Sequence, residues 1–283
     1  MNDEFIKINI KNSLFNDISQ IEDIVSVSLV GSFVDKDDLT GISDIDTIVI
    51  CKELNEEIFN NCIETVKSID LQKCGLKNYK VKVNPTFGPL KFDEPNLAVI
   101  HLMIYDIKGH RKHVIASPFT CFDWERSNHF SGQNLNSIFP VGALQLRDFM
   151  EVRRSMENYI EDLNQNVISY REYQFKNGKP VEMKKKMLMD DRHKGEFAYH
   201  IVKNLISNYL KFYLQKNNYF SENKITEEIS RLFYGNSQDI VKKYQTIRSV
   251  KKKRGSRYPS YCTDFVKKFI NEFQNKISEE WDS

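Results

Sequence analysis

Apolar side chains follow two different spacings in the first 120 residues of the chain. They recur at mostly helical intervals over residues 3–24 and every three or four positions over residues 54–71, which predicts two amphipathic helices. Short apolar or alternating runs predict four strands, over residues 25–30, 44–51, 79–83 and 97–107. The order of these elements indicates an α+β domain with a mixed β-sheet and flanking helices.

Helical spacing dominates the chain from residue 142 onward. Four segments show it, at residues 144–163, 187–214, 225–233 and 265–277. Ser, Asn and Gly accumulate over residues 127–141, which is typical of a connection between domains. We therefore expect an α+β domain over residues 1–130 and an all-helical domain over residues 140–283.

Composition and charge narrow the class of protein. The chain carries 41 Lys and Arg against 39 Asp and Glu, so bulk charge predicts neither a nucleic-acid nor a membrane partner. The five cysteines form no CxxC pair, which favours reduced thiols over a disulfide framework. The first residues show no basic segment followed by an apolar one, so we expect no signal peptide, and no apolar run approaches the roughly 20 residues that span a bilayer. We expect a cytoplasmic protein that does not enter a membrane.

The strongest chemical signal lies in residues 29–50, LVGSFVDKDDLTGISDIDTIVI. Asp44 and Asp46 are two residues apart within an apolar strand. Side chains at i and i+2 share one face of a strand, roughly 7 Å apart, so the carboxylates repel each other unless a cation lies between them. Hard oxygen ligands favour Mg²⁺ or Mn²⁺ over zinc. The pattern therefore predicts a divalent-metal site at this strand.

The same stretch resembles the nucleotidyltransferase superfamily of the DNA polymerase beta type. The matching residues are Val30, Gly31 and Ser32, then Ser43, Asp44, Ile45 and Asp46 after a spacer. The motif GxSDID at residues 41–46 is most similar to that of antibiotic nucleotidyltransferases and minimal bacterial relatives. The resemblance implies that Gly31, Ser32 and Ser43 lie against a nucleoside triphosphate such as ATP. It also implies that Asp44 and Asp46 hold one or two magnesium ions on the phosphates.

The family has a third carboxylate on a neighbouring strand, and this chain departs from it there. The best-placed position in the strand over residues 97–107 is His101, which is not an acid. Asp106 lies five residues further on and faces the other way by strand alternation. Three alternatives follow: His101 serves as metal ligand or proton acceptor, Asp106 takes the role through a bulge, or the third group is absent.

The helical part is similar to the second domain with which many of these enzymes close over the nucleotide. The resemblance implies a basic residue on a helix at the triphosphate, and the candidates are Arg192, His193 and Lys194. The alternative is a solvated basic helix end. The basic run over residues 251–257 is either a phosphate-binding segment or a solvated charge run.

The expected activity is metal-dependent transfer of a nucleoside monophosphate to a hydroxyl of an acceptor. A small molecule such as an antibiotic is favoured as acceptor, because near-neutral charge disfavours a large RNA. The alternatives are a toxin-type enzyme acting on tRNA or protein, and a catalytically weak nucleotide-binding or regulatory protein.

Overall fold

The computed structural model describes residues 2–88, 96–253 and 257–281. The chain divides into two compact units. The first unit contains Met1–Gly142 and Tyr170–Lys185, and the second contains Ala143–Ser169 and Lys186–Ser283. The first unit is therefore larger than the domain expected over residues 1–130, because it includes a later segment of the chain.

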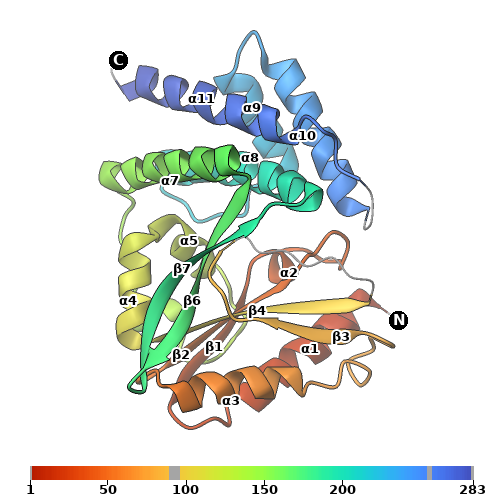
Figure 1. The fold of residues 1–283 in the computed structure, drawn as a ribbon, viewed down its shortest axis with the longest axis vertical. Coiled ribbons are helices and arrows are strands. Elements are labelled where there is room, and N and C mark those ends of the chain that lie inside the picture. The colour runs from red at the N-terminus through yellow and green to blue at the C-terminus, as the bar shows by residue number, and fades with distance from the viewer. Residues whose placement is uncertain (1, 89–95, 254–256, 282–283) are drawn as a thin grey trace. The chain divides into compact units, whose positions relative to one another are not determined.

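A five-stranded mixed sheet forms the centre of the first unit (Figure 1). Its strands are β1 (Ile24–Val30), β2 (Ile45–Cys51), β3 (Lys80–Asn84), β4 (Leu97–Asp106) and β5 (Phe130–Gly132). The spatial order is β3-β4-β2-β1-β5. Strand β4 runs parallel to both β2 and β3, whereas β1 runs antiparallel to β2 and β5. The predicted α+β class with a mixed sheet is confirmed.

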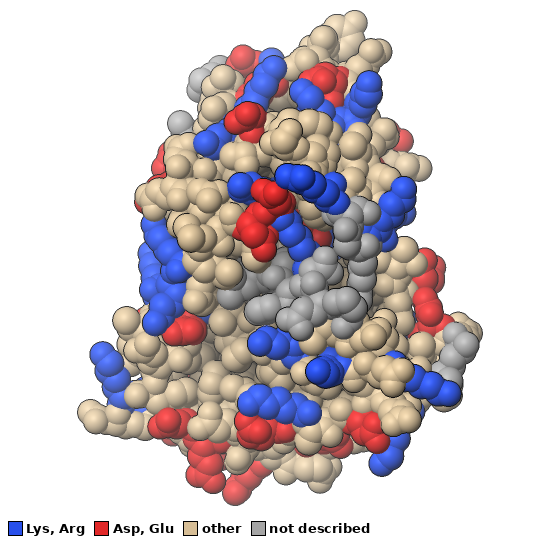
Figure 2. All heavy atoms as spheres, turned by 45° about the vertical axis from the view of Figure 1, so that its right-hand side comes forward, with Lys and Arg blue, Asp and Glu red and all other residues tan. Residues whose placement is uncertain are grey.

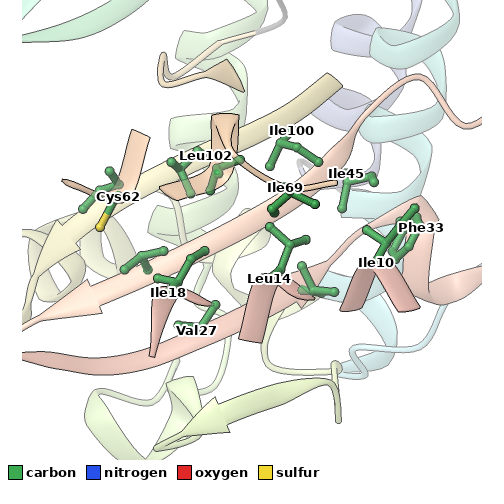
Figure 3. Close-up of a cluster of buried hydrophobic side chains, with 14 of the residues drawn as sticks. Ile10, Leu14, Ile18, Val27, Phe33, Ile45, Cys62, Ile69, Ile100 and Leu102 are labelled. Carbon is green, nitrogen blue, oxygen red and sulfur yellow. The ribbon is translucent and has the colours of Figure 1, made fainter. Parts of the chain in front are cut away.

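Alternation along the strands gives the sheet two separate cores. Helices α1 (Asp3–Ile18) and α3 (Glu56–Lys67) cover one face. Figure 3 shows this core, with Leu14 and Ile18 of α1 beside Val27 of β1. The opposite face is covered by α4 (Ile107–Ala116), α5 (Pro118–Trp124) and α6 (Leu135–Ile138). Every second residue of β2 and β4 therefore belongs to the second core, which contains the chemistry described below.

A long hairpin, β6 (Val167–Lys176) and β7 (Lys179–Leu188), interrupts the region that was expected to be all-helical. That expectation was wrong at this point. Asn177 and Gly178 join the strands with positive φ angles of 54° and 73°, the geometry of a type I′ turn. Residues 170–185 of the hairpin, which include its turn, belong to the first unit, where Tyr173 and Phe175 pack against the core.

The second unit is mostly helical. Its helices are α7 (Leu146–Gln165), α8 (Asp191–Leu214), α9 (Glu222–Leu232), α10 (Ser237–Lys252) and α11 (Cys262–Trp281). Glu222 of α9 connects this helix to α8 and α10, because it accepts hydrogen bonds from the hydroxyls of Tyr199 and Tyr244 (both 2.7 Å) and from Lys203 (3.1 Å). A partly buried carboxylate is tolerated when hydrogen bonds satisfy its oxygens.

Among the residues that the structure describes, no helix is long and apolar enough to cross a membrane. The face drawn in Figure 2 carries basic and acidic side chains interspersed. This mixture agrees with the nearly equal numbers of the two kinds in the sequence.

We predict that a partly buried histidine makes the first unit sensitive to acid. His113 stacks on Trp124, with ring centroids 5.0 Å apart. Burial lowers its pKa to about 4, and the nearby positive charges of Arg171 and His110 add to this effect. The unfolded chain therefore binds a proton that the folded chain excludes, and stability is lost as pH falls from about 6.5 towards 4.

The measurement is denaturant unfolding at pH 7 and pH 4.5. Between these pH values we expect the free energy of unfolding of His113→Phe to fall by on the order of 2 kcal/mol less than that of the unmodified protein. The reason is that Phe keeps the stacked ring without a group that binds a proton. Equal losses in both proteins would show that His113 does not carry the effect.

Candidate metal and nucleotide site

Strand pairing sets four residues in one row across the sheet. Val30 of β1 pairs with Asp46 of β2, Asp46 pairs with His101 of β4, and His101 pairs with Asn84 of β3. Directly paired residues in neighbouring strands point to the same face of a sheet. Sequence alone left open whether His101 reaches the carboxylates, and the register answers that it lies beside Asp46.

Asp44, Asp46 and His101 form a compact group of ligand atoms. One atom from each residue lies within 4.8 Å of the others. Asp44 is buried, with 7% of its surface exposed, and Asp46 keeps 27% of its side chain exposed. Ser43 donates its hydroxyl proton to Oδ1 of Asp44 over 2.8 Å. Ser43 is therefore a support of the carboxylate in this geometry, whereas a contact with a nucleotide stays a prediction.

His101 is held from both sides. Its Nδ1 lies 2.8 Å from Oδ1 of Asp46, and its Nε2 lies 2.6 Å from the backbone carbonyl oxygen of Thr86. A carboxylate and a carbonyl oxygen both accept hydrogen bonds, so the ring lies between two acceptor oxygens. The two contacts fix the orientation of the ring beside Asp46.

The turn after β1 approaches the same carboxylate closely. Gly31 has a φ of +72°, a conformation that L side chains rarely adopt. A Cβ atom at this position would lie 2.5 Å from Oδ2 of Asp46. The glycine therefore lets the backbone of the turn lie against the acidic group. Ser32 follows at once and begins the short helix α2 (Ser32–Asp35).

A partly buried arginine fixes the end of this turn. Arg126 donates from Nε and Nη2 to both oxygens of Asp35, over 3.2 and 2.6 Å, and from Nη1 to Asp123 over 2.6 Å. The forked geometry holds Asp35 in one orientation. Ser127, the next residue, donates to the carbonyl oxygen of Leu29 in β1. The segment after α5 thus secures both sides of the Gly31-Ser32 turn.

The donor set fits a hard divalent cation. Asp44 and Asp46 supply carboxylate oxygens at the mouth of a buried strand, and Mg²⁺ commonly takes one or two carboxylates together with water and phosphate oxygens. His101 offers a third ligand atom in the same group. The fit to a hard cation rests on the two aspartates, because their oxygens are the ligands that such a cation prefers.

Two other expected residues have contacts of their own. Asp106 pairs with Cys51 at the far end of β2 and β4, and its carboxylate caps α4 by accepting from the backbone of Gly109. It therefore lies apart from Asp44, Asp46 and His101, because it is five positions beyond His101 along a strand of regular register. Lys194 lies in α8 of the second unit, where its ammonium is 3.5 Å from Asp191. Its contact with a triphosphate stays a prediction.

The basic run at the end of α10 begins with a structural residue. Lys251 pairs with Glu196 over 2.8 Å, and only 9% of its side chain is exposed. Residues 254–256 lie outside the described part of the chain. The side chain of Lys251 therefore forms an internal ion pair, and is neither a solvated charge nor a phosphate contact in this structure.

Sequence reasoning missed Thr86 and Arg126. Thr86 contributes a backbone carbonyl, and a backbone group leaves no residue-specific signal. Arg126 is 91 residues away from Asp35 along the chain. A contact of that separation depends on the tertiary fold, which no local pattern reveals.

We predict that Gly31→Ala destabilises the first unit and displaces Asp46. Gly178→Ala is the matched control, because its φ is +73° and nothing lies within 4 Å of its would-be Cβ. Both variants carry the cost of a left-handed residue, about 1 kcal/mol, and only Gly31→Ala adds the clash. In denaturant unfolding we expect Gly31→Ala to lower the free energy of unfolding by at least about 1 kcal/mol more than Gly178→Ala does. Equal losses would mean that the turn moves away at no cost.

Comparisons with known proteins leave the site to be interpreted from its residues. A scan against protein-family models found no match, and a search among curated proteins found none either. Function is in any case a property of a site and not of a fold.

Proposed function

We propose that this protein is a metal-dependent nucleotidyltransferase, which moves a nucleoside monophosphate from a nucleoside triphosphate to a hydroxyl group. The observation that carries the proposal is the grouping of Asp44 and Asp46 within 4.8 Å, directly against the backbone of the Gly31 turn. Clustered carboxylates suit a divalent ion, and a glycine turn beside them allows phosphate oxygens to approach the backbone.

The residues of the chain have separate tasks in this reaction. Asp44 and Asp46 would hold the ion, Ser43 orients Asp44, and His101 orients Asp46. Gly31 and Ser32 would bind the triphosphate through backbone N–H groups and the Ser32 hydroxyl. A bound magnesium ion supplies neutralisation of phosphate charge and alignment of the phosphates.

The transfer itself exchanges one phosphorus–oxygen bond for another. The acceptor oxygen bonds to the α-phosphorus, and the bond from that phosphorus to the pyrophosphate oxygen breaks. Pyrophosphate leaves, and the hydroxyl proton passes to solvent.

A small hydroxyl compound is the favoured acceptor. Acidic and basic side chains are interspersed on the face drawn in Figure 2, where a large RNA acceptor would favour a continuous basic surface. One observation favours a second function, a nucleotide-binding protein with weak transfer. A histidine stands where this superfamily has its third acid, so the site has fewer negative charges for metal ions.

We predict that Asp44→Asn and Asp46→Asn each lower transfer by at least a hundredfold, because either change removes a metal-binding charge. The assay follows label from α-³²P nucleoside triphosphates in the presence of Mg²⁺ and a panel of hydroxyl acceptors, together with pyrophosphate release. Asp106→Asn is the matched control, since Asn caps a helix about as well as Asp and the residue lies outside the group. Transfer retained in either of the first two variants would contradict the proposal.

A further prediction concerns the arginine that secures the turn. Arg126→Lys keeps the charge but loses the fork that holds Asp35, so we expect the KM for the nucleotide to rise several-fold with a smaller change in kcat. Arg111→Lys, on the exposed surface of α4, is the control and should leave both constants unchanged. A fall in kcat alone would show that Arg126 does not act through nucleotide binding.

A further inference from the structure

The row of residues across the sheet ends in a buried amide that lacks one hydrogen bond. Asn84, the last residue of β3, pairs in register with His101, which pairs with Asp46. Paired residues of neighbouring strands point to the same face, so Asn84 lies on the face that carries the candidate metal site. Only 3% of its surface is exposed. Its Nδ2 has no hydrogen-bond partner among the residues that the structure describes.

Contacts of Thr86 fix how this amide is turned. The Thr86 hydroxyl donates to Oδ1 of Asn84 over 2.7 Å, and the Thr86 carbonyl oxygen lies 2.6 Å from Nε2 of His101. Thr86 therefore joins Asn84 to the site. The oxygen and the nitrogen of an amide point in different directions, so the bond to Oδ1 turns Nδ2 away from the Thr86 hydroxyl. A buried N–H group without a partner destabilises a fold unless a ligand or a water supplies the acceptor.

The chemistry of transfer indicates which ligand lies on this side of the site. In the proposed function the triphosphate lies at the Gly31-Ser32 turn after β1, and the metal-bound α-phosphate lies at Asp44 and Asp46. The attacking and leaving oxygens are on opposite sides of the phosphorus in an in-line displacement. Strands β4 and β3 follow β2 in the sheet on the side away from β1. The acceptor therefore approaches from the side on which Asn84 lies.

We propose that Asn84 binds the acceptor, with Nδ2 donating a hydrogen bond to an acceptor oxygen other than the reacting hydroxyl. The proposal rests on the nucleotidyltransferase function proposed above and specifies how the acceptor is recognised. Neighbouring strands lie about 4.8 Å apart, so two spacings, roughly 10 Å, separate the backbones of Asn84 and Asp46. The acceptor therefore carries a second oxygen, from a hydroxyl, ether or carbonyl group, on its side facing β3. A compound with a single oxygen leaves Nδ2 unpaired and binds more weakly.

The test is NMR of the Asn84 side-chain amide in the full chain labelled with ¹⁵N-asparagine. The protein is loaded with Mg²⁺ and the α,β-methylene analogue of ATP, GTP, CTP or UTP, because these analogues bind without transfer. Inositol, ribose, glucosamine and cyclohexanol are then titrated in. We expect at least one of the three compounds with several oxygens to shift the Asn84 resonances saturably, and cyclohexanol to leave them in place. The amide of Asn55, which caps α3, is the internal control and should not move.

Variants separate binding of the acceptor from a structural role. Asn84→Leu removes the donor at similar volume, and we expect the dissociation constant of the shifting compound to rise at least about tenfold. The dissociation constant of the nucleotide analogue should change by less than about twofold, because Asn84 lies on the acceptor side. Thr86→Val keeps Nδ2 and removes only the hydroxyl that holds Oδ1, so its effect should be smaller. Spectra of Asn84→Leu, or of Asn84→Asp if the leucine variant does not fold, identify the resonances by their absence.

Each outcome has a distinct meaning. Asn84 resonances that none of the compounds shifts would overturn the inference and leave a buried water as the partner of Nδ2. A shift with the nucleotide analogue alone, or an equal loss of nucleotide affinity in Asn84→Leu, would also overturn it. All of these results leave the proposed function in place.

The proposed function fails in a different way. A compound that shifts the Asn84 resonances but never receives label from an α-³²P nucleoside triphosphate would contradict transfer, and not the binding of that compound by Asn84. An unmodified protein that binds none of the nucleotide analogues would overturn the proposed function, and the inference with it.

Discussion

The parallel register of β2 against β4 is the constraint on which the rest of the site depends. It sets Asp46 beside His101, and the antiparallel register with β1 sets Asp46 beside the residue before Gly31. A slip of one residue would turn Asp46 and His101 to the opposite face, among the side chains of α1 and α3. The two apolar cores forbid such a slip, because it would also turn the alternating apolar residues of β2 and β4 towards the wrong helices.

The long apolar segments were the part of the fold that the sequence could predict. Strands β1, β2 and β4 and helix α3 lie close to their expected positions, because burial of a strand or of one helix face produces a clear pattern of apolar residues in the sequence. The pattern in the hairpin β6–β7 is weaker. Its strands are mostly half-exposed and rich in charge, and Asn177-Gly178 was interpreted as a break between helices and not as a hairpin turn.

The candidate site divides in the same way. Asp44, Asp46 and Gly31 were found because their spacing within one short stretch has a chemical meaning. The choice among His101, Asp106 and no third group depends on how the strands pair. The local sequence of two segments 55 residues apart does not predict their pairing. Arg126 shows the limit further, because its partner Asp35 belongs to a helix of four residues that no periodicity announces.

The hairpin also determines when the first unit can finish folding during synthesis. Residues 170–185 complete the first unit, although residues 143–169 of the second unit precede them in the chain. A ribosome that has released only the first 142 residues has therefore not yet supplied Tyr173 and Phe175 to the core, nor Arg171 to its backbone bridge with Phe87. The first unit matures late in synthesis, and its unfinished core is exposed during that interval to association with other chains and to chaperones.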